Sequence, residues 1–169
     1  MQKYVLSTIM GVESLAKKEV ERQGGKIEEV VDRLVTFSGG PEMIPRMNYW
    51  SRVGNKLYML LAEEENVIDF DTLFDAVNNI HWKKYFKKDF PIMVKATSLR
   101  SDLGAIPTIQ SISKKAITKS LTGGTNQTVL EDNELEKMGI LILLVDNKLR
   151  VLLDTTGKAL HMRGYRLEA

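Results

Sequence analysis

The sequence predicts a protein of mixed α and β structure, built from two small units. Segments with strand periodicity alternate with amphipathic helical segments along the chain, and an acidic run at residues 63–75 separates the first half from the second. The 43% hydrophobic content of the 169 residues is sufficient for a buried core. Because the chain has no Cys, a disulfide framework and a thiolate-based zinc site are excluded.

The first half follows the order β-α-β-β-α-β, which is typical of a ferredoxin-like fold. Strands are predicted at residues 3–9, 26–31, 33–39 and 55–64. The first helix should end at Gly24-Gly25, and the second, within residues 41–52, is kept short by Pro45. One face of the first helix is expected to carry Val12, Leu15, Ala16, Val20 and Gln23.

The second half reads as an α/β unit of roughly 100 residues, a usual size for a small domain. A helix is predicted at residues 71–86 and a strand at residues 90–98. A loop with Gly and Pro then leads into a helix at residues 109–124. Two apolar runs around Asp146-Asn147 predict a β-hairpin, because both residue types tolerate the left-handed turn conformation.

The helix at residues 109–124 is amphipathic. Its predicted buried stripe consists of Ile109, Ile112, Ala116, Ile117 and Leu121. The opposite side should present Ser111, Lys114, Lys115 and Lys119. This helix is therefore expected to dock by its apolar side and to show its lysines to a partner.

The net charge of only +2 conceals a strong separation of charges into blocks. Residues 63–75 hold six acids and no base, whereas residues 81–120 hold nine bases against Asp89 and Asp102. The segment 148–166 adds five bases against Asp154. Two basic segments could fold into one phosphate-binding surface, although ordinary solvated helix faces are the alternative for each segment alone.

Signs of catalysis are sparse. His81 and His161 are far apart in sequence, and neither has a second ligand at the spacing that a helical metal site needs. The chain has no glycine-rich loop of the kind that binds a dinucleotide or S-adenosylmethionine. No apolar run approaches the roughly 20 residues of a membrane helix. We therefore expect a cytoplasmic, monomeric chain that is not an enzyme on its own and that holds no cofactor or metal.

The segment LDTTGKALHMRGYR resembles the end of the THUMP region in bacterial methyltransferases that modify the exocyclic amine of guanine in large-subunit ribosomal RNA. The matching residues are Asp154, Gly157, Leu160, His161, Arg163, Gly164, Tyr165 and Arg166, with Thr156 in place of a Ser. The stretches MGVESLAKKEV, YWSRVGNKL and VNNIHWKKYF agree with the same family in the same order. In the segment SKKAI, Lys115 stands where the family has an Asp.

The resemblance implies a ferredoxin-like subdomain at residues 1–64 followed by a THUMP RNA-binding domain at residues 65–166. It also implies a catalytic domain, absent from this chain, that uses S-adenosylmethionine. The chain would then be a truncated or a naturally short form. Structured RNA is the implied partner, with ribosomal RNA favoured over transfer RNA; a module that binds protein, or one from a tRNA-modifying enzyme, is the alternative.

The residues expected to contact RNA are cations, hydroxyl groups and one aromatic ring. They are Lys95, Ser98, Arg100, Ser101, Lys114, Lys115, Lys119, Arg163, Tyr165 and Arg166. The cations would neutralise phosphates, and the two serines would bind phosphate or ribose oxygens. Tyr165 would either stack on an unpaired base or anchor the segment by packing.

Overall fold

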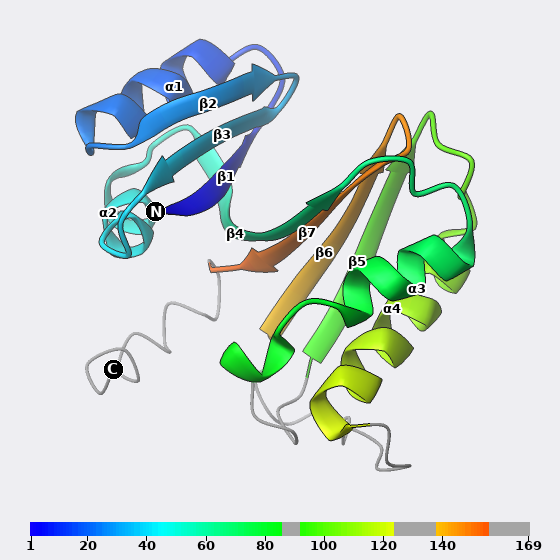
Figure 1. Ribbon diagram of the computed structural model, residues 1–169. Coiled ribbons are helices and arrows are strands. Elements are labelled where there is room, and N and C mark those ends of the chain that lie inside the picture. Colours follow the sequence, from blue (N-terminus) through cyan, green and yellow to red (C-terminus); the bar gives the residue numbers. More distant parts are fainter. Residues whose placement is uncertain (86–91, 124–137, 156–169) are drawn as a thin grey trace. The chain divides into compact units, whose positions relative to one another are not determined.

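The computed structural model of the protein describes residues 1–85, 92–123 and 138–155, which form two compact units (Figure 1). Unit 1 contains Met1–Leu60 together with Asp154 and Thr155, and unit 2 contains the described residues of Leu61–Leu153. The units divide at residues 60/61, whereas the domain boundary expected from the sequence is 64/65. The predicted mixed α and β fold class is confirmed.

Unit 1 has the ferredoxin-like order of elements that the sequence predicts. The elements are β1 (Gln2–Thr8), α1 (Glu13–Arg22), β2 (Lys26–Val31), β3 (Leu34–Gly39), α2 (Met43–Trp50) and β4 (Gly54–Glu64), the last four residues of which belong to unit 2. The strands lie in the order β2-β3-β1-β4, and each neighbouring pair is antiparallel. This order is that of the ferredoxin-like βαββαβ fold.

Both helices of unit 1 pack on one face of its strands. The core is formed by Tyr4, Leu6, Ala16, Val20, Val35, Phe37, Met43, Met47 and Leu57. Leu15, which we expected on the inner face of α1, is 49% exposed. Ala16 and Val20, one turn apart, make the buried contacts of α1 instead, and the small Ala16 allows a close approach to the strands.

Unit 2 is a second α and β unit. Its further elements are α3 (Phe70–Asn78), the 3-10 helix η1 (Trp82–Lys84), β5 (Ile92–Leu99), α4 (Ile106–Thr122), β6 (Met138–Val145) and β7 (Lys148–Asp154). Strand β6 lies between β5, to which it is parallel, and β7, to which it is antiparallel. Helices α3 and α4 lie together on one side of these strands (Figure 1), and β5 is the last strand of the order.

Helix α3 is shorter than the helix predicted at residues 71–86. It begins at a capping box, in which the Asp69 carboxylate accepts a hydrogen bond from the Thr72 backbone N–H at 2.8 Å. This bond is the main reason that the pKa of Asp69 lies below its ordinary value. The helix ends at Asn78 because the indole N–H of the fully buried Trp82 donates to the Val77 carbonyl at 2.7 Å, so the chain turns into η1.

Helix α4 starts earlier than predicted, at Ile106, and Pro107 fits its first turn because N–H groups there have no intrahelical partner. Its buried stripe differs from the prediction at one position. Ser113 is fully buried, whereas Ile112 is only half-buried at the flank of the stripe. Within the part of the chain that the structure describes, the Ser113 hydroxyl has no hydrogen-bond partner, so burying this small side chain carries the cost of an unsatisfied polar group.

The β6–β7 hairpin has the two-residue turn predicted from the sequence, and both Asp146 (φ 51°) and Asn147 (φ 63°) are left-handed. The loop after β5 is fastened to this turn. Arg100 binds the Asp146 carboxylate through two nitrogens at 2.8 and 3.2 Å. The Ser101 hydroxyl accepts the Asn147 N–H at 3.0 Å, and the Asp102 N–H donates to the Asn147 side chain at 2.8 Å.

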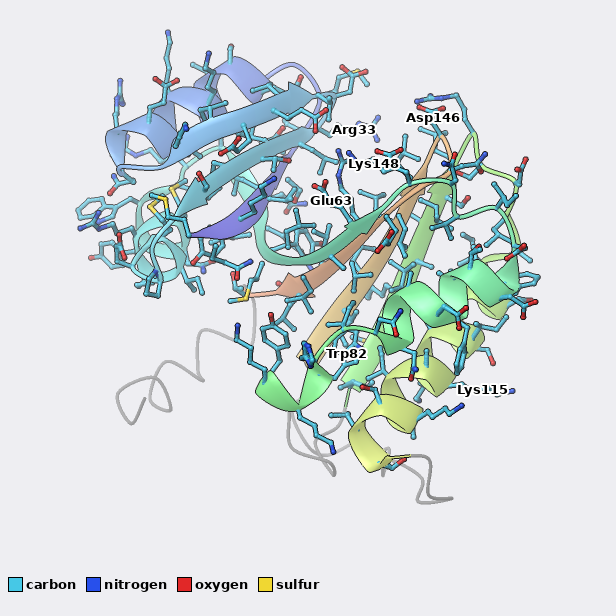
Figure 2. All side chains as sticks on the ribbon, viewed as in Figure 1. Arg33, Glu63, Trp82, Lys115, Asp146 and Lys148 are labelled. Atoms are coloured by element: carbon cyan, nitrogen blue, oxygen red, sulfur yellow. The ribbon has the colours of Figure 1, made fainter. Side chains whose placement is uncertain are left out.

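A charged cluster connects the last residues of β4 with β7 within unit 2. The Glu63 carboxylate lies 3.8 Å from Nε of Arg150 and 3.6 Å from Nζ of Lys148 (Figure 2). Glu65 also approaches Lys148, at 3.7 Å, but its side chain is 72% exposed. The Arg150 side chain is only 9% exposed, so the nearby carboxylate of Glu63 offsets the cost of burying its charge.

We predict that Glu63→Gln lowers the free energy of unfolding by about 1–3 kcal/mol, because a buried arginine loses a nearby counter-charge. Glu65→Gln is the matched control: it removes the same charge from an exposed pair and should cost less than about 1 kcal/mol. Urea unfolding of both variants measures the difference. Equal effects of the two substitutions would contradict a structural role for Glu63.

We predict that Arg100→Ala raises the pKa of Asp146 toward its ordinary value of 3.8. The Arg100 hydrogen bonds hold this pKa low, and its charge adds to the effect. The pKa of Asp146 is lower in the folded state than in the unfolded state. The Arg100–Asp146 pair therefore stabilises the fold at pH values above the unfolded-state pKa, and this stabilisation is lost as the pH falls through the folded-state pKa.

Carboxyl titration by NMR would follow Asp146 in Arg100→Ala. The pKa of Asp69, which is held down by its own cap, should stay unchanged and serves as the internal control. An Asp146 pKa that does not move would rule out Arg100 as the cause.

Candidate nucleic-acid interface

The exposed side of α4 carries the lysines that the sequence assigns to a partner. Lys115 and Lys119 are one helical turn apart and both are exposed, whereas Lys114 is half-buried at the flank. Lys115 points away from the strands of unit 2 (Figure 2). Within the described parts of the chain, neither Lys115 nor Lys119 forms an ion pair, so both charges face solvent.

Two further exposed lysines lie on η1, which contacts the same helix. Lys83 and Lys84 belong to η1 and are exposed, and η1 packs on α4. The Ser120 hydroxyl, beside Lys119, donates to the Ile80 carbonyl at 3.4 Å and connects the two elements at this end. We call Lys83, Lys84, Lys115 and Lys119 the lysine cluster. The charge block at residues 81–120 already contained Lys83 and Lys84, but the packing of η1 on α4 could not be read from the sequence.

Aromatic rings orient two members of the lysine cluster. The Lys119 ammonium lies 5.5 Å from the ring centre of Phe74 on α3, and the Lys84 ammonium lies 5.7 Å from that of Tyr85. Both distances are within the roughly 6 Å range of a cation–π contact. These contacts restrict the side chains without neutralising their charge. The cluster therefore keeps its ability to attract an anion.

Lys95 lies apart from the lysine cluster. Along β5 the buried and half-buried residues Ile92, Val94 and Ala96 alternate with exposed ones, and Lys95 belongs to the exposed set. Successive side chains of a strand point to opposite faces. Because α3 and α4 cover the face that carries Ile92, Lys95 lies on the other face of this last strand.

The remaining predicted contacts after β5 have partners within the fold. The Ser98 hydroxyl donates to the Leu103 carbonyl at 2.5 Å, and the Ser101 hydroxyl donates to the Leu99 carbonyl at 3.1 Å. Arg100 is bound to Asp146, although its side chain stays 63% exposed. These three residues shape the loop. Arg163, Tyr165 and Arg166 lie outside the described residues.

Within residues 1–85, 92–123 and 138–155, no group of three or more His, Cys, Asp or Glu side chains is arranged to hold a metal ion. Over the same residues, no helix combines the length and the apolar character that crossing a bilayer requires.

Comparison with known proteins finds a similarity for unit 1. Residues 3–58 match the model of the RlmL ferredoxin-like domain. This range begins within β1 and ends in the middle of β4, so it covers at least part of every helix and strand of the ferredoxin-like order.

Two curated relatives match nearly the whole chain. One is YpsC of Bacillus subtilis, named as a candidate RNA methyltransferase, which is 33% identical over 99% of this chain and 44% of its own length. The other is the tRNA (guanine(6)-N2)-methyltransferase of Methanocaldococcus jannaschii, 29% identical over 97% of this chain and 44% of its own length. The chain thus spans less than half the length of these relatives.

Solved structures agree with the sequence matches. A possible methylase from Clostridium difficile superposes with a TM-score of 0.83 at 32% identity, covering 97% of this chain and 44% of that one. SMU.472, a methyltransferase homologue complexed with SAH, superposes with a TM-score of 0.81 at 31% identity, covering 92% and 42%. Residues 3–58 are thus similar to the RlmL ferredoxin-like domain, and nearly the whole chain is similar to part of proteins that are named as RNA methyltransferases.

Proposed function

We propose that the chain is an RNA-binding module in which unit 2 is a THUMP domain and the lysine cluster contacts backbone phosphates. One observation carries the proposal: four exposed lysines of η1 and α4, which form no ion pair within the described residues, occur in a chain similar to RNA methyltransferases. Lys95 and Arg100 would extend the contact around the last strand.

The chemistry of this surface favours recognition of RNA shape rather than sequence. Ammonium groups neutralise phosphates and release counterions, which gives salt-dependent affinity but little information about the bases. Proteins recognise structured RNA largely through its backbone and its helical form. The lysine cluster would bind the RNA backbone, and residues outside this cluster would recognise the RNA bases.

We further propose that the module acts together with a guanine methyltransferase domain that uses S-adenosylmethionine. The two curated relatives are more than twice as long as the matched region and are named as RNA methyltransferases, and SMU.472 was solved with SAH. The module would work in the cytoplasm as a monomer. In this arrangement its task is to present the RNA, while catalysis belongs to the other domain.

Ribosomal RNA is our first candidate for the substrate, because the motif at residues 154–166 resembles that of large-subunit enzymes. Transfer RNA is the second, because one relative over nearly the whole chain is named as a tRNA methyltransferase. The two candidates share the same phosphate chemistry. A competition between a ribosomal RNA hairpin and a transfer RNA for this chain distinguishes them.

We predict that Lys115→Gln/Lys119→Gln weakens binding to an RNA hairpin with a single-stranded overhang and lowers the salt slope by about two, one for each phosphate contact. Fluorescence anisotropy at several salt concentrations gives both quantities. Lys17→Gln/Lys26→Gln is the control, because it removes the same charge from exposed positions in unit 1.

Equal losses in the two double variants would mean that only net charge matters. A DNA duplex of the same sequence tests the preference for RNA. If RNA and DNA bind equally weakly and no variant changes the affinity, unit 2 is not an RNA-binding surface, and a module that binds protein becomes the better explanation.

A further inference from the structure

We propose that unit 1 carries a second RNA contact, in which an unpaired nucleobase stacks on Trp50 and its phosphates meet Arg22 and Arg52. This inference rests on the proposed function for the class of ligand, but it concerns different residues, a different unit and a different kind of contact. It predicts a preference for single-stranded nucleotides that the lysine cluster does not provide.

The first observation is an exposed aromatic pair at the end of α2. Met43 and Met47 point into the core of unit 1, which leaves Tyr49 and Trp50 on the solvent side, 69% and 60% exposed. The two rings meet edge to face, with centres 4.9 Å apart and planes at 78°. Two adjacent aromatic side chains exposed to this degree form an apolar patch, and such patches mark binding sites more often than isolated exposed residues do.

The second observation is a shallow cavity beside Trp50, with a volume of about 280 Å³. Its lining residues come from the ends of α1 and α2 and from the turn after α2: Glu19, Arg22, Gln23, Met47, Trp50, Ser51 and Arg52. Small-molecule sites usually measure about 300–1,000 Å³. The cavity therefore suits one flat ring system resting against Trp50 rather than a larger enclosed ligand.

The third observation concerns the partners of the charged side chains that line this cavity. Both oxygens of the Glu19 carboxylate are used within the fold, one by the Ser51 hydroxyl at 2.7 Å and the other by the Arg52 backbone N–H at 2.9 Å. In the described part of the chain, the Arg22 and Arg52 side chains form no ion pair. Two guanidinium groups thus stand beside an aromatic ring, and the one carboxylate is already satisfied.

An aromatic face next to guanidinium groups matches the two halves of a nucleotide. Bases stack on Trp and Tyr regardless of their identity, because every base has a π face. Guanidinium groups bind phosphate through two parallel hydrogen bonds and also stack on rings. A base inside a duplex has no free face to offer. The ligand that fits is therefore an unpaired nucleotide of an RNA strand.

The test uses the emission of Trp50 in the 169-residue chain. The other tryptophan, Trp82, is fully buried, so the solvent-exposed emission belongs to Trp50. Titration with a six-nucleotide oligo(A) RNA should quench this emission, because the stacked base contacts the indole. An abasic RNA of the same length keeps the phosphates and lacks the bases, and it should quench far less.

Variants separate stacking from charge. Trp50→Ala should weaken binding of the hexamer by about 5- to 150-fold, the loss expected for one stacked base, whereas Trp50→Phe should keep most of the affinity. Arg52→Gln should lower the salt slope by about one. Anisotropy of a labelled hexamer measures these affinities, and near-UV circular dichroism checks that each variant is folded.

The outcomes distinguish the two proposals. If RNA still quenches the Trp50 emission in Lys115→Gln/Lys119→Gln, the Trp50 site is supported. If the same variant also binds the hairpin as tightly as the unaltered chain, only the proposed function of unit 2 fails. Equal quenching by normal and abasic RNA, or equal hexamer affinity of Trp50→Ala and the unaltered chain, overturns the Trp50 site. A Trp50 emission that changes with protein concentration alone overturns it too, since the pair would then be a surface for self-association.

Discussion

The exposed lysines of unit 2 depend on one packing constraint: the inner side of α4 is entirely used by the core. Ile109, Ala116, Ile117 and Leu121 are buried there, and the fully buried Ser113 continues the same stripe. With 3.6 residues per turn, burying these positions turns Lys115 and Lys119 to the outside. Lys83 and Lys84 lie on η1, which contacts the same helix. The charge of this surface is therefore fixed by the hydrophobic core beneath it.

The two basic groups of the chain differ in chemistry. The lysine cluster presents compact, strongly hydrated ammonium groups, which act as point charges toward phosphates. Around Trp50 the cations are guanidinium groups, which bind phosphate in a planar geometry and stack on rings. Arg100 differs from both groups, because its guanidinium group also fastens the loop after β5 to the Asp146 turn. A count of basic residues along the sequence cannot separate these three roles, since the role follows from what lies beside each side chain.

Periodicity and turn chemistry predicted most of the fold. The alternation in β1, β3 and β4, the paired glycines after α1 and the Asp146-Asn147 turn are local signals, and the structure confirms the elements that they predicted. The misses have tertiary causes. Helix α3 ends early because the Trp82 indole N–H donates a hydrogen bond to the Val77 carbonyl. In α4, Ser113 rather than Ile112 is buried, because the elements packed against the helix determine which side of it is covered. Likewise, the charge block predicted basic residues in this region, but only the structure shows that η1, which carries Lys83 and Lys84, contacts α4. It also shows that the Ser98 and Ser101 hydroxyls donate hydrogen bonds within the loop.

Taken together, the two proposed contacts require an RNA with two features. An array of phosphates satisfies the lysine cluster, and at least one unpaired base satisfies Trp50. Such an RNA also suits modification of guanine, because an enzyme that acts on a base must first take it out of its stack, which costs least where pairing is already incomplete. A module that binds unpaired nucleotides as well as a phosphate array would therefore favour substrates whose target base costs little free energy to expose, before any catalytic group has contacted that base.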